Sequence, residues 1–188
     1  MADPNMRTAP AAVLDLDRVE GLQEIPFKAQ VNLRGNSDDL EFMSGVMSVI
    51  GCDLPTGPNR CNEGNEVKAL WLSPDEWLIV GEDGKQNDLL WKLEKALTGQ
   101  HVAVNDLSAN RTIFELSGPH ALTILMKSGD MDFHPRVFKT GDCAQTLLGK
   151  SQALVEKVDN EVFHVYVRCS FSRYVGGWLK DALTEFQT

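Results

Sequence analysis

The sequence is poor in positive charge and has no long hydrophobic run. Its 18 Lys and Arg residues are outnumbered by 27 Asp and Glu residues, which gives a formal net charge of −9. A nucleic-acid-binding protein needs clustered Lys and Arg against phosphate, and an anionic membrane surface attracts the same residues. No apolar run approaches membrane length, and the first residues lack the apolar core of a secretory signal. These absences predict a cytoplasmic protein that binds neither nucleic acid nor a membrane.

The sequence also lacks the common motifs of enzyme and metal sites. Its four cysteines form no C-x-x-C pair, and no histidine pair completes a zinc pattern. Without a secretory signal, a disulfide between Cys52 and Cys61 is the less favoured alternative to reduced thiols. There is no G-x-G-x-x-G, no P-loop and no G-x-S-x-G. The sequence therefore predicts no catalytic, cofactor-binding or metal-binding residue.

The most distinctive segment is a predicted β-hairpin at residues 69–81. Two apolar runs flank the tetrapeptide Ser73–Glu76, whose leading serine and proline suit a type I turn. Trp71 and Trp77 lie at the ends of the runs nearest the turn. Core packing is the default for both, but tryptophan is also frequent in binding hot spots. Both residues therefore stay open as interface candidates.

The hydrophobic pattern predicts the order β-α-β-β-α-β for the first half of the chain. Alternation at 27–34 indicates a strand, and the spacing of apolar residues from Leu40 to Ile50 indicates a helix with Ser37 as its N-cap. After a polar loop come the hairpin, a second helix near 86–97 and a strand near 102–107. This is the split order of a ferredoxin-like unit.

The same order restarts at residue 112 with a strand, followed by a helix that begins near Pro119. Three strands and a last helix are expected after an irregular stretch, near 143–148, 152–158, 162–168 and 175–186. In the third of these strands His164 alternates with apolar neighbours, so we expect it on the polar face. The second half ends before a closing strand.

The predicted fold class is therefore α+β, with two packed ferredoxin-like halves of β-α-β-β-α type. The halves are residues 25–110 and 111–188, and together they form one unit, residues 25–188. Residues 1–24 are rich in Pro, Ala and Asp with weak periodicity. They are predicted to form an N-terminal arm that either stays mobile or lies on a partner.

Two loops hold further candidates for interface or weak ligand contacts. His134 and Arg136 could bind a carboxylate or phosphate, although Arg136 holding a nearby acidic group is the favoured alternative. Between the halves, Asp106, Ser108 and Arg111 could line a ligand pocket. Equally, Asp106 and Arg111 could pair across the junction and fix the angle between the halves. The sequence leaves both alternatives open.

Several short motifs along residues 25–187 occur together in one protein family. They are Val31-Asn32-Leu33-Arg34-Gly35, Leu54-Pro55, the hairpin from Leu70 to Leu78, Asp106-Leu107-Ser108 with Arg111, Leu116 to Ala121, and Ser172-Arg173-Tyr174. In them the chain resembles the gamma subunit of heterotetrameric, tetrahydrofolate-linked sarcosine oxidase. The Ser117-Gly118-Pro119 helix start is shared more widely, with the folate-binding aminomethyltransferases of the glycine cleavage system.

The resemblance implies an aminomethyltransferase folate-binding-domain-like fold and a non-catalytic subunit without a cofactor of its own. The complex of this family oxidatively demethylates sarcosine to glycine, yields hydrogen peroxide and passes the one-carbon unit to tetrahydrofolate. Alpha, beta and small delta subunits are the implied partners, and FAD, FMN, NAD, tetrahydrofolate and zinc are expected in them. The alternatives are a stand-alone tetrahydrofolate-binding or one-carbon transfer protein, and the gamma-like subunit of an N-methylglutamate dehydrogenase complex.

Overall fold

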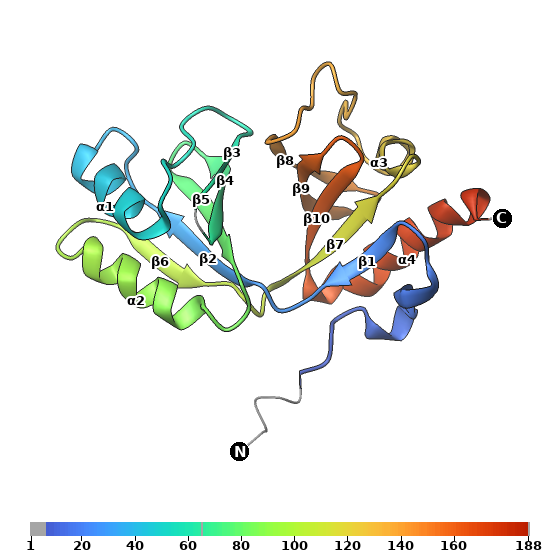
Figure 1. Cartoon of the computed structure of the whole chain (residues 1–188), viewed down its shortest axis with the longest axis horizontal. Coiled ribbons are helices and arrows are strands. Elements are labelled where there is room, and N and C mark those ends of the chain that lie inside the picture. Colours follow the sequence, from blue (N-terminus) through green and yellow to red (C-terminus); the bar gives the residue numbers. More distant parts are fainter. Residues whose placement is uncertain (1–6, 65, 188) are drawn as a thin grey trace.

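Two α+β halves lie side by side in the computed structural model, which describes residues 7–187 except residue 65. Each half is a five-stranded antiparallel sheet with helices on its outer face (Figure 1). The inner faces of the two sheets pack against each other through a shared apolar cluster. The layers are therefore helices, sheet, sheet, helices. Over the described residues, no helix combines the length and apolar character that a membrane crossing requires.

The first half follows the predicted order with one added strand. Its sheet has the strand order β3-β4-β5-β2-β6, so α2 joins two strands with one strand between them, and α1 joins two strands with two between them. This interleaving is that of a ferredoxin-like unit, which confirms the predicted type. The elements are β2 (Ala29–Arg34), α1 (Leu40–Ile50), β3 (Cys61–Glu63), β4 (Val67–Ser73), β5 (Glu76–Gly81), α2 (Gln86–Ala96) and β6 (Ala103–Asp106). The added strand, β3, lies in the stretch predicted as a polar loop.

The second half repeats this arrangement, but its outermost strand comes from the N-terminal segment. Its elements are β7 (Arg111–Ser117), α3 (Ala121–Ser128), β8 (Cys143–Leu148), β9 (Ser151–Asp159), β10 (Val162–Arg168) and α4 (Ser172–Leu183), with β1 (Leu22–Ile25) completing the sheet. The strand order is β1-β7-β10-β9-β8. β1 thus lies beside β7 as β6 lies beside β2. The closing strand that the second half lacks in sequence is supplied by β1.

The prediction of an arm over residues 1–24 is therefore wrong for its later part, while residues 1–6 lie outside the described residues. Two short 3₁₀ helices, Ala12–Leu14 and Leu16–Arg18, precede β1. Ala11, Leu16, Val19 and Leu22 are buried in the core of the second half. The Glu24 carboxylate accepts hydrogen bonds from the Ala11 amide at 3.0 Å and the Thr112 hydroxyl at 2.6 Å. This segment is part of the folded unit, because it buries apolar side chains and completes a sheet.

Leu22→Ala should lower the free energy of unfolding by about 2–5 kcal/mol, because a buried leucine is replaced by a cavity. Leu22 is 3% exposed and faces the core of the second half. Val13→Ala is the control, since Val13 lies in the same segment and is 65% exposed. Denaturant unfolding of the full chain measures both changes. Equal stability of the two variants would contradict the assignment of this segment to the fold.

The predicted hairpin forms, and both faces of its strands are buried. Trp71 and Trp77 lie opposite each other across β4 and β5. At the turn, the Ser73 hydroxyl donates to Asp75 at 2.6 Å, and Arg34 donates to the same carboxylate at 2.9 Å. Successive strand residues point to opposite faces. Trp77 therefore packs under α1 and α2, whereas its neighbour Leu78 faces the second sheet.

The N-cap of the first helix lies two residues later than expected. Asp39, not Ser37, is the N-cap of α1, and its carboxylate accepts the amides of Glu41 at 2.9 Å and Phe42 at 3.3 Å. An aspartate at this position satisfies amides that have no partner within the helix and complements its dipole. Gly51, at φ 76°, ends the helix in a left-handed conformation that glycine adopts without strain.

Candidate functional site between the two halves

A cavity of about 480 Å³ lies between the two halves, where the facing sheets part. Its wall combines apolar side chains, such as Val80 and Ile113, with charged side chains such as Lys28 and Glu82. Small-molecule sites in proteins commonly have such volumes and such mixed walls. The polar residues of this wall are therefore the first candidates for chemistry.

Three side chains of the wall, Lys68, His164 and Tyr166, converge on the carboxylate of Glu156. Lys68 Nζ donates to Oε1 at 2.5 Å, and the Tyr166 hydroxyl donates to Oε2 at 2.6 Å. His164 Nδ1 lies 3.6 Å from Oε2, and its Nε2 lies 3.1 Å from Glu115. Lys68 belongs to β4 of the first half and the other residues to β7, β9 and β10 of the second. The cluster therefore ties the halves together.

The environment of Glu156 keeps it ionised although its side chain is only 3% exposed. Burial alone would raise the pKa of this carboxyl, because a low dielectric disfavours charge. The adjacent His164 ring and the charge and hydrogen bond of Lys68 outweigh burial, and the Tyr166 hydroxyl adds to them, so the pKa lies below its ordinary value. Burial and the adjoining carboxylate raise the pKa of Tyr166 well above its usual range. Tyr166 therefore stays a hydrogen-bond donor.

The polar groups of the cluster are engaged with one another within the chain. The Glu156 carboxylate is occupied by donors of the chain itself. The adjoining Cys143 thiol and burial raise the pKa of the nearby Cys61, which favours the protonated thiol. Within residues 7–64 and 66–187, no three His, Cys, Asp or Glu side chains are grouped in a way that could hold a metal ion.

This cluster is absent from the sequence-based candidates, although His164 lies, as expected, on the polar strand face opposite to Phe163 and Val165. His164 faces the other half rather than solvent, because the inner face of β10 is covered by the first sheet. One signal in the sequence does mark the site. Glu156 and Lys157 interrupt an apolar run in β9 and are both buried. A charged pair inside such a strand requires buried partners.

Of the two hairpin tryptophans, Trp77 has no surface to offer a partner or ligand. It is 0% exposed, and its Nε1 donates to the Pro55 carbonyl at 2.8 Å. Its ring lies 5.8 Å from that of Phe42. Trp71 is half-buried against the same core, and its buried Nε1 has no hydrogen-bond partner among the described residues. The interface prediction is thus wrong for Trp77 and stays a prediction for Trp71.

Arg111 lies at the junction of the halves, as the sequence suggests, but does not pair with Asp106. Asp106 instead accepts the Ser108 amide at 2.9 Å and the Ser108 hydroxyl at 2.6 Å. All three residues line a second cavity, of about 490 Å³. Of the two alternatives left open by the sequence, the structure favours the pocket-lining one.

His134 and Arg136 are exposed in the loop between α3 and β8, apart from the cavities described above. The His134 ring accepts the Arg136 amide through Nδ1 at 3.2 Å, and the Arg136 guanidinium lies 3.4 Å from Asp132. Backbone donation from His134, the hydrogen bond from Arg136 and its charge outweigh slight desolvation and lower the pKa of Asp132. This is the arrangement of the favoured alternative, in which Arg136 holds a nearby acidic group. A ligand role for this loop stays untested.

Known proteins resemble this chain in both sequence and structure. A family model described as the sarcosine oxidase, gamma subunit family matches residues 34–185. The sarcosine oxidase subunit gamma of Arthrobacter sp is 36% identical over 166 residues, which is 88% of this chain and 80% of that protein. The solved heterotetrameric sarcosine oxidase from Corynebacterium sp. U-96, in complex with pyrrole 2-carboxylate, contains a chain with TM-score 0.89 and 30% identity, and the match covers 97% of both chains.

A more distant similarity concerns the fold alone. The glycine cleavage system aminomethyltransferase T from Bartonella henselae matches with TM-score 0.64 and 18% identity, over 88% of this chain and 46% of that one. The expected aminomethyltransferase-like fold is thereby confirmed. The match to the gamma subunit family spans both halves, including the hairpin, the polar cluster and Arg111. This chain belongs to the sarcosine oxidase gamma subunit family.

Proposed function

We propose that this chain is a non-catalytic gamma subunit that binds the large subunits of a heterotetrameric sarcosine oxidase. The observation that carries the proposal is an exposed aromatic face on a chain whose buried polar cluster is satisfied internally. A subunit without an activated catalytic group contributes by binding its neighbours. Similar proteins that are named sarcosine oxidase subunit gamma support this proposal. So does the similar chain in a solved heterotetrameric sarcosine oxidase.

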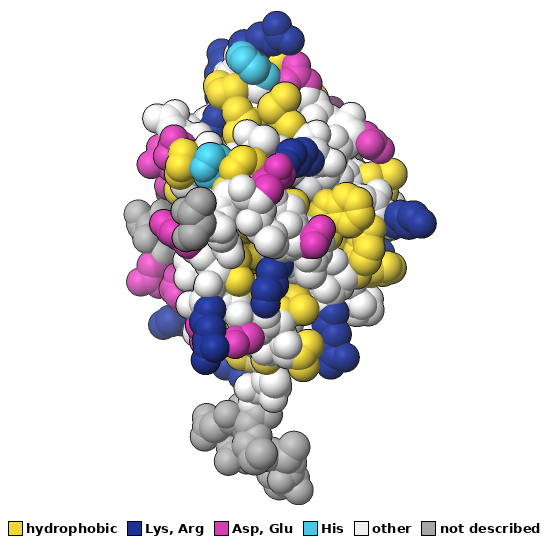
Figure 2. All heavy atoms as spheres, turned by 90° about the vertical axis from the view of Figure 1, so that its right-hand side faces the viewer, with side chains coloured by type: hydrophobic (Ala, Val, Ile, Leu, Met, Phe, Trp, Pro, Cys, Tyr) yellow, Lys and Arg dark blue, Asp and Glu magenta, His cyan; other side chains and the backbone are white. Residues whose placement is uncertain are grey.

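The aromatic face consists of Phe171, Tyr174 and Trp178. Each of these side chains is about two-fifths exposed, and they follow one another at helical spacing into α4. Figure 2 views the molecule from the side of α3 and α4, where hydrophobic side chains reach the surface among charged ones. An exposed apolar group of this kind is typical of a protein–protein contact, in which aromatic residues supply much of the binding energy.

Hydrogen bonds fix the two largest rings of this aromatic face in place. Trp178 Nε1 donates to the Ser128 hydroxyl at 3.0 Å, and the Tyr174 hydroxyl accepts the Lys150 amide at 3.0 Å. The two rings lie 6.2 Å apart. Side chains that are already ordered lose little conformational entropy on association. The face is therefore prepared for a partner rather than merely left uncovered.

In this proposal the complex demethylates sarcosine oxidatively to glycine, releases hydrogen peroxide and transfers the one-carbon unit to tetrahydrofolate in the cytoplasm. The partner subunits alpha, beta and delta hold FAD, FMN, NAD, tetrahydrofolate and zinc. The gamma chain contributes its folded surface. The chain itself is proposed to bind none of these cofactors and to be colourless when purified alone.

Trp178→Gln should weaken assembly at least tenfold, because it removes an exposed aromatic anchor while an amide can still reach Ser128. Trp91→Gln is the matched control, since Trp91 is 57% exposed on α2 of the other half. Each tagged variant is co-expressed with the large subunits, and the recovered flavoprotein is measured by its absorbance. Failure of the unaltered chain to recover flavoprotein would overturn the proposed subunit function. Equal recovery with both variants would show that the partner contacts another face of the chain.

A second candidate is a stand-alone tetrahydrofolate-binding or one-carbon transfer protein, and the 480 Å³ cavity between the halves favours it. Calorimetric titration of the full chain with tetrahydrofolate distinguishes it from the leading proposal. Saturable binding at micromolar ligand, combined with no recovery of flavoprotein, would support this candidate. Recovery of an oxidoreductase that accepts N-methylglutamate in place of sarcosine would identify the related dehydrogenase complex instead.

A further inference from the structure

Two arginines lie directly opposite each other on neighbouring strands of the second sheet, at the strand ends. Arg168 of β10 pairs in register with Arg111 of β7. Directly opposed residues of an antiparallel pair project to the same face of the sheet with their Cβ atoms about 4.5–5.5 Å apart. Like charges at such positions destabilise the sheet. The repulsion between the two arginines therefore lowers the stability of the isolated chain.

No carboxylate of the described part of the chain neutralises this pair. Neither guanidinium forms an ion pair there, and the buried Nη1 of Arg111 has no hydrogen-bond partner. The nearby Glu76 already accepts the Asn32 amide group at 2.7 Å. Burial lowers the pKa of Arg111 most, and the positive charge of Arg168 lowers it further. The negative charge of Glu76 acts in the opposite direction. The guanidinium donors thus lack the anion that they are suited to bind.

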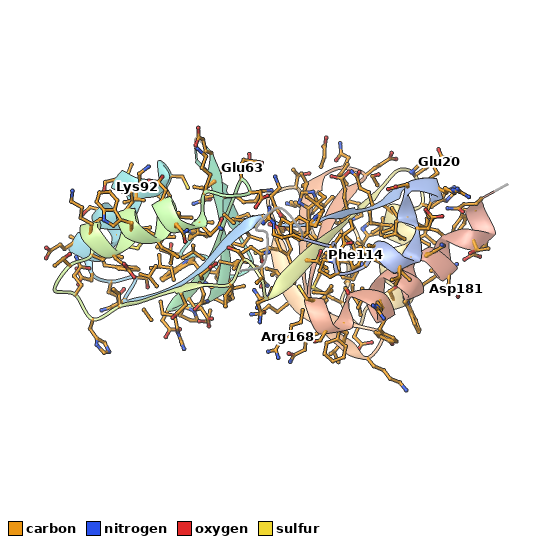
Figure 3. The ribbon with its side chains drawn as sticks, turned by 90° about the horizontal axis from the view of Figure 1, so that it is seen from below. Glu20, Glu63, Lys92, Phe114, Arg168 and Asp181 are labelled. Atoms are coloured by element: carbon orange, nitrogen blue, oxygen red, sulfur yellow. The ribbon has the colours of Figure 1, made fainter. Side chains whose placement is uncertain are left out.

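The two arginines share a cavity of about 410 Å³ with Gln145, Gln152 and Leu147. No Asp or Glu is among the described residues that line it, although the whole chain has a formal net charge of −9. In Figure 3, Arg168 lies near the junction of the halves. It is on the opposite side of the view from Glu63, which lines the 480 Å³ cavity. Arg168 directly precedes the short 3₁₀ helix Cys169–Phe171, which carries Phe171 of the aromatic face. The positive cavity therefore lies beside the chain segment that begins the proposed docking surface.

We propose that Arg111 and Arg168 form a binding site for a carboxylate, supplied by an Asp or Glu side chain of the partner subunit that covers the aromatic face. This inference rests on the proposed function. A carboxylate between two guanidinium groups satisfies their forked donors and removes the repulsion between them. The position of the cavity beside the aromatic face favours a side chain of the docked partner over a free metabolite. The positive charge of the two arginines favours a partner with an acidic surface.

Arg168→Gln tests the site, because it should affect the isolated chain and the complex in opposite directions. The melting temperature of the isolated full chain should stay equal or rise, since the like-charge contact is relieved. The affinity for the large subunits should fall about tenfold or more, because a charged hydrogen-bonded pair is lost. Arg18→Gln removes the same charge from an exposed site and should change neither quantity. Arg168→Lys, which keeps the charge but loses the fork, should restore only part of the affinity.

The outcomes separate this inference from the proposed function. If Arg168→Gln assembles like the unaltered chain while Trp178→Gln does not, the carboxylate site is overturned and the docking face stands. A lower melting temperature of Arg168→Gln would show that the arginine is structural, which also overturns the site. Succinate at matched ionic strength probes a free carboxylate as the occupant. If succinate stabilises the unaltered chain but not the variant, and assembly is unchanged, the partner side chain is excluded as the occupant.

Discussion

Replacing Trp77 by alanine is expected to lower the free energy of unfolding by about 3–5 kcal/mol. The residue is fully buried between β5 and the helices of the first half, and its ring contacts that of Phe42. The indole also donates a hydrogen bond to the Pro55 carbonyl, so truncation leaves both a cavity and an acceptor without its donor. For a chain of this size, the loss corresponds to a fall in melting temperature of roughly 6–20 °C.

Two further variants separate burial from interface effects at this position. Trp91→Ala, on the exposed face of α2, should change stability by less than about 0.5 kcal/mol. Trp77→Phe keeps most of the volume and should cost less than the alanine variant. Urea unfolding of the isolated chain measures all three. If Trp77→Ala keeps its stability and loses only assembly, the side chain contacts a partner and its buried placement is wrong.

The hairpin and most helices could be predicted because their determinants are local. The turn residues between Ser73 and Glu76 and the spacing of apolar residues in α1 act over a few positions. The role of residues 22–25 could not be predicted in this way. β1 is only four residues long, and it becomes a strand because β7, about ninety residues away in the sequence, offers an unpaired edge. Pairing over such a separation has no local signature.

The same distinction applies to the candidate sites. The sequence points to Arg111 because it lies where the halves join, and the structure places it in two cavities. The sequence does not single out Arg168, since its importance comes from its register with Arg111. Lys68 and Glu156 are likewise 88 residues apart and become partners only when the two sheets stack. Local periodicity predicts which side chains share one face of a strand. It does not predict which other element of the chain covers that face.

The buried pair between the halves leads to the second large effect, which is expected from Lys68→Met. Glu156 would remain buried without its cation, which should cost about 3–5 kcal/mol. Lys28→Met is the matched control, because it removes the same group from the exposed pair with Glu82 and should cost at most about 1 kcal/mol. Adding Glu156→Leu and Tyr166→Phe to Lys68→Met should recover much of the loss, because no buried polar group is then left unpaired. Thermal and urea unfolding of each variant measure these differences.

Acid unfolding gives an independent readout of the same cluster. The folded state holds the pKa of Glu156 below its ordinary value of about 4.5, so the ionised carboxylate stabilises the fold above that pH. This stabilisation is lost as the pH falls through the lower, folded-state pKa. Lys68→Met removes part of what lowers the pKa, so its acid unfolding midpoint should move to higher pH, while the triple variant should lack this contribution. An acid midpoint unchanged by Lys68→Met would mean that the ionisation of Glu156 does not depend on Lys68.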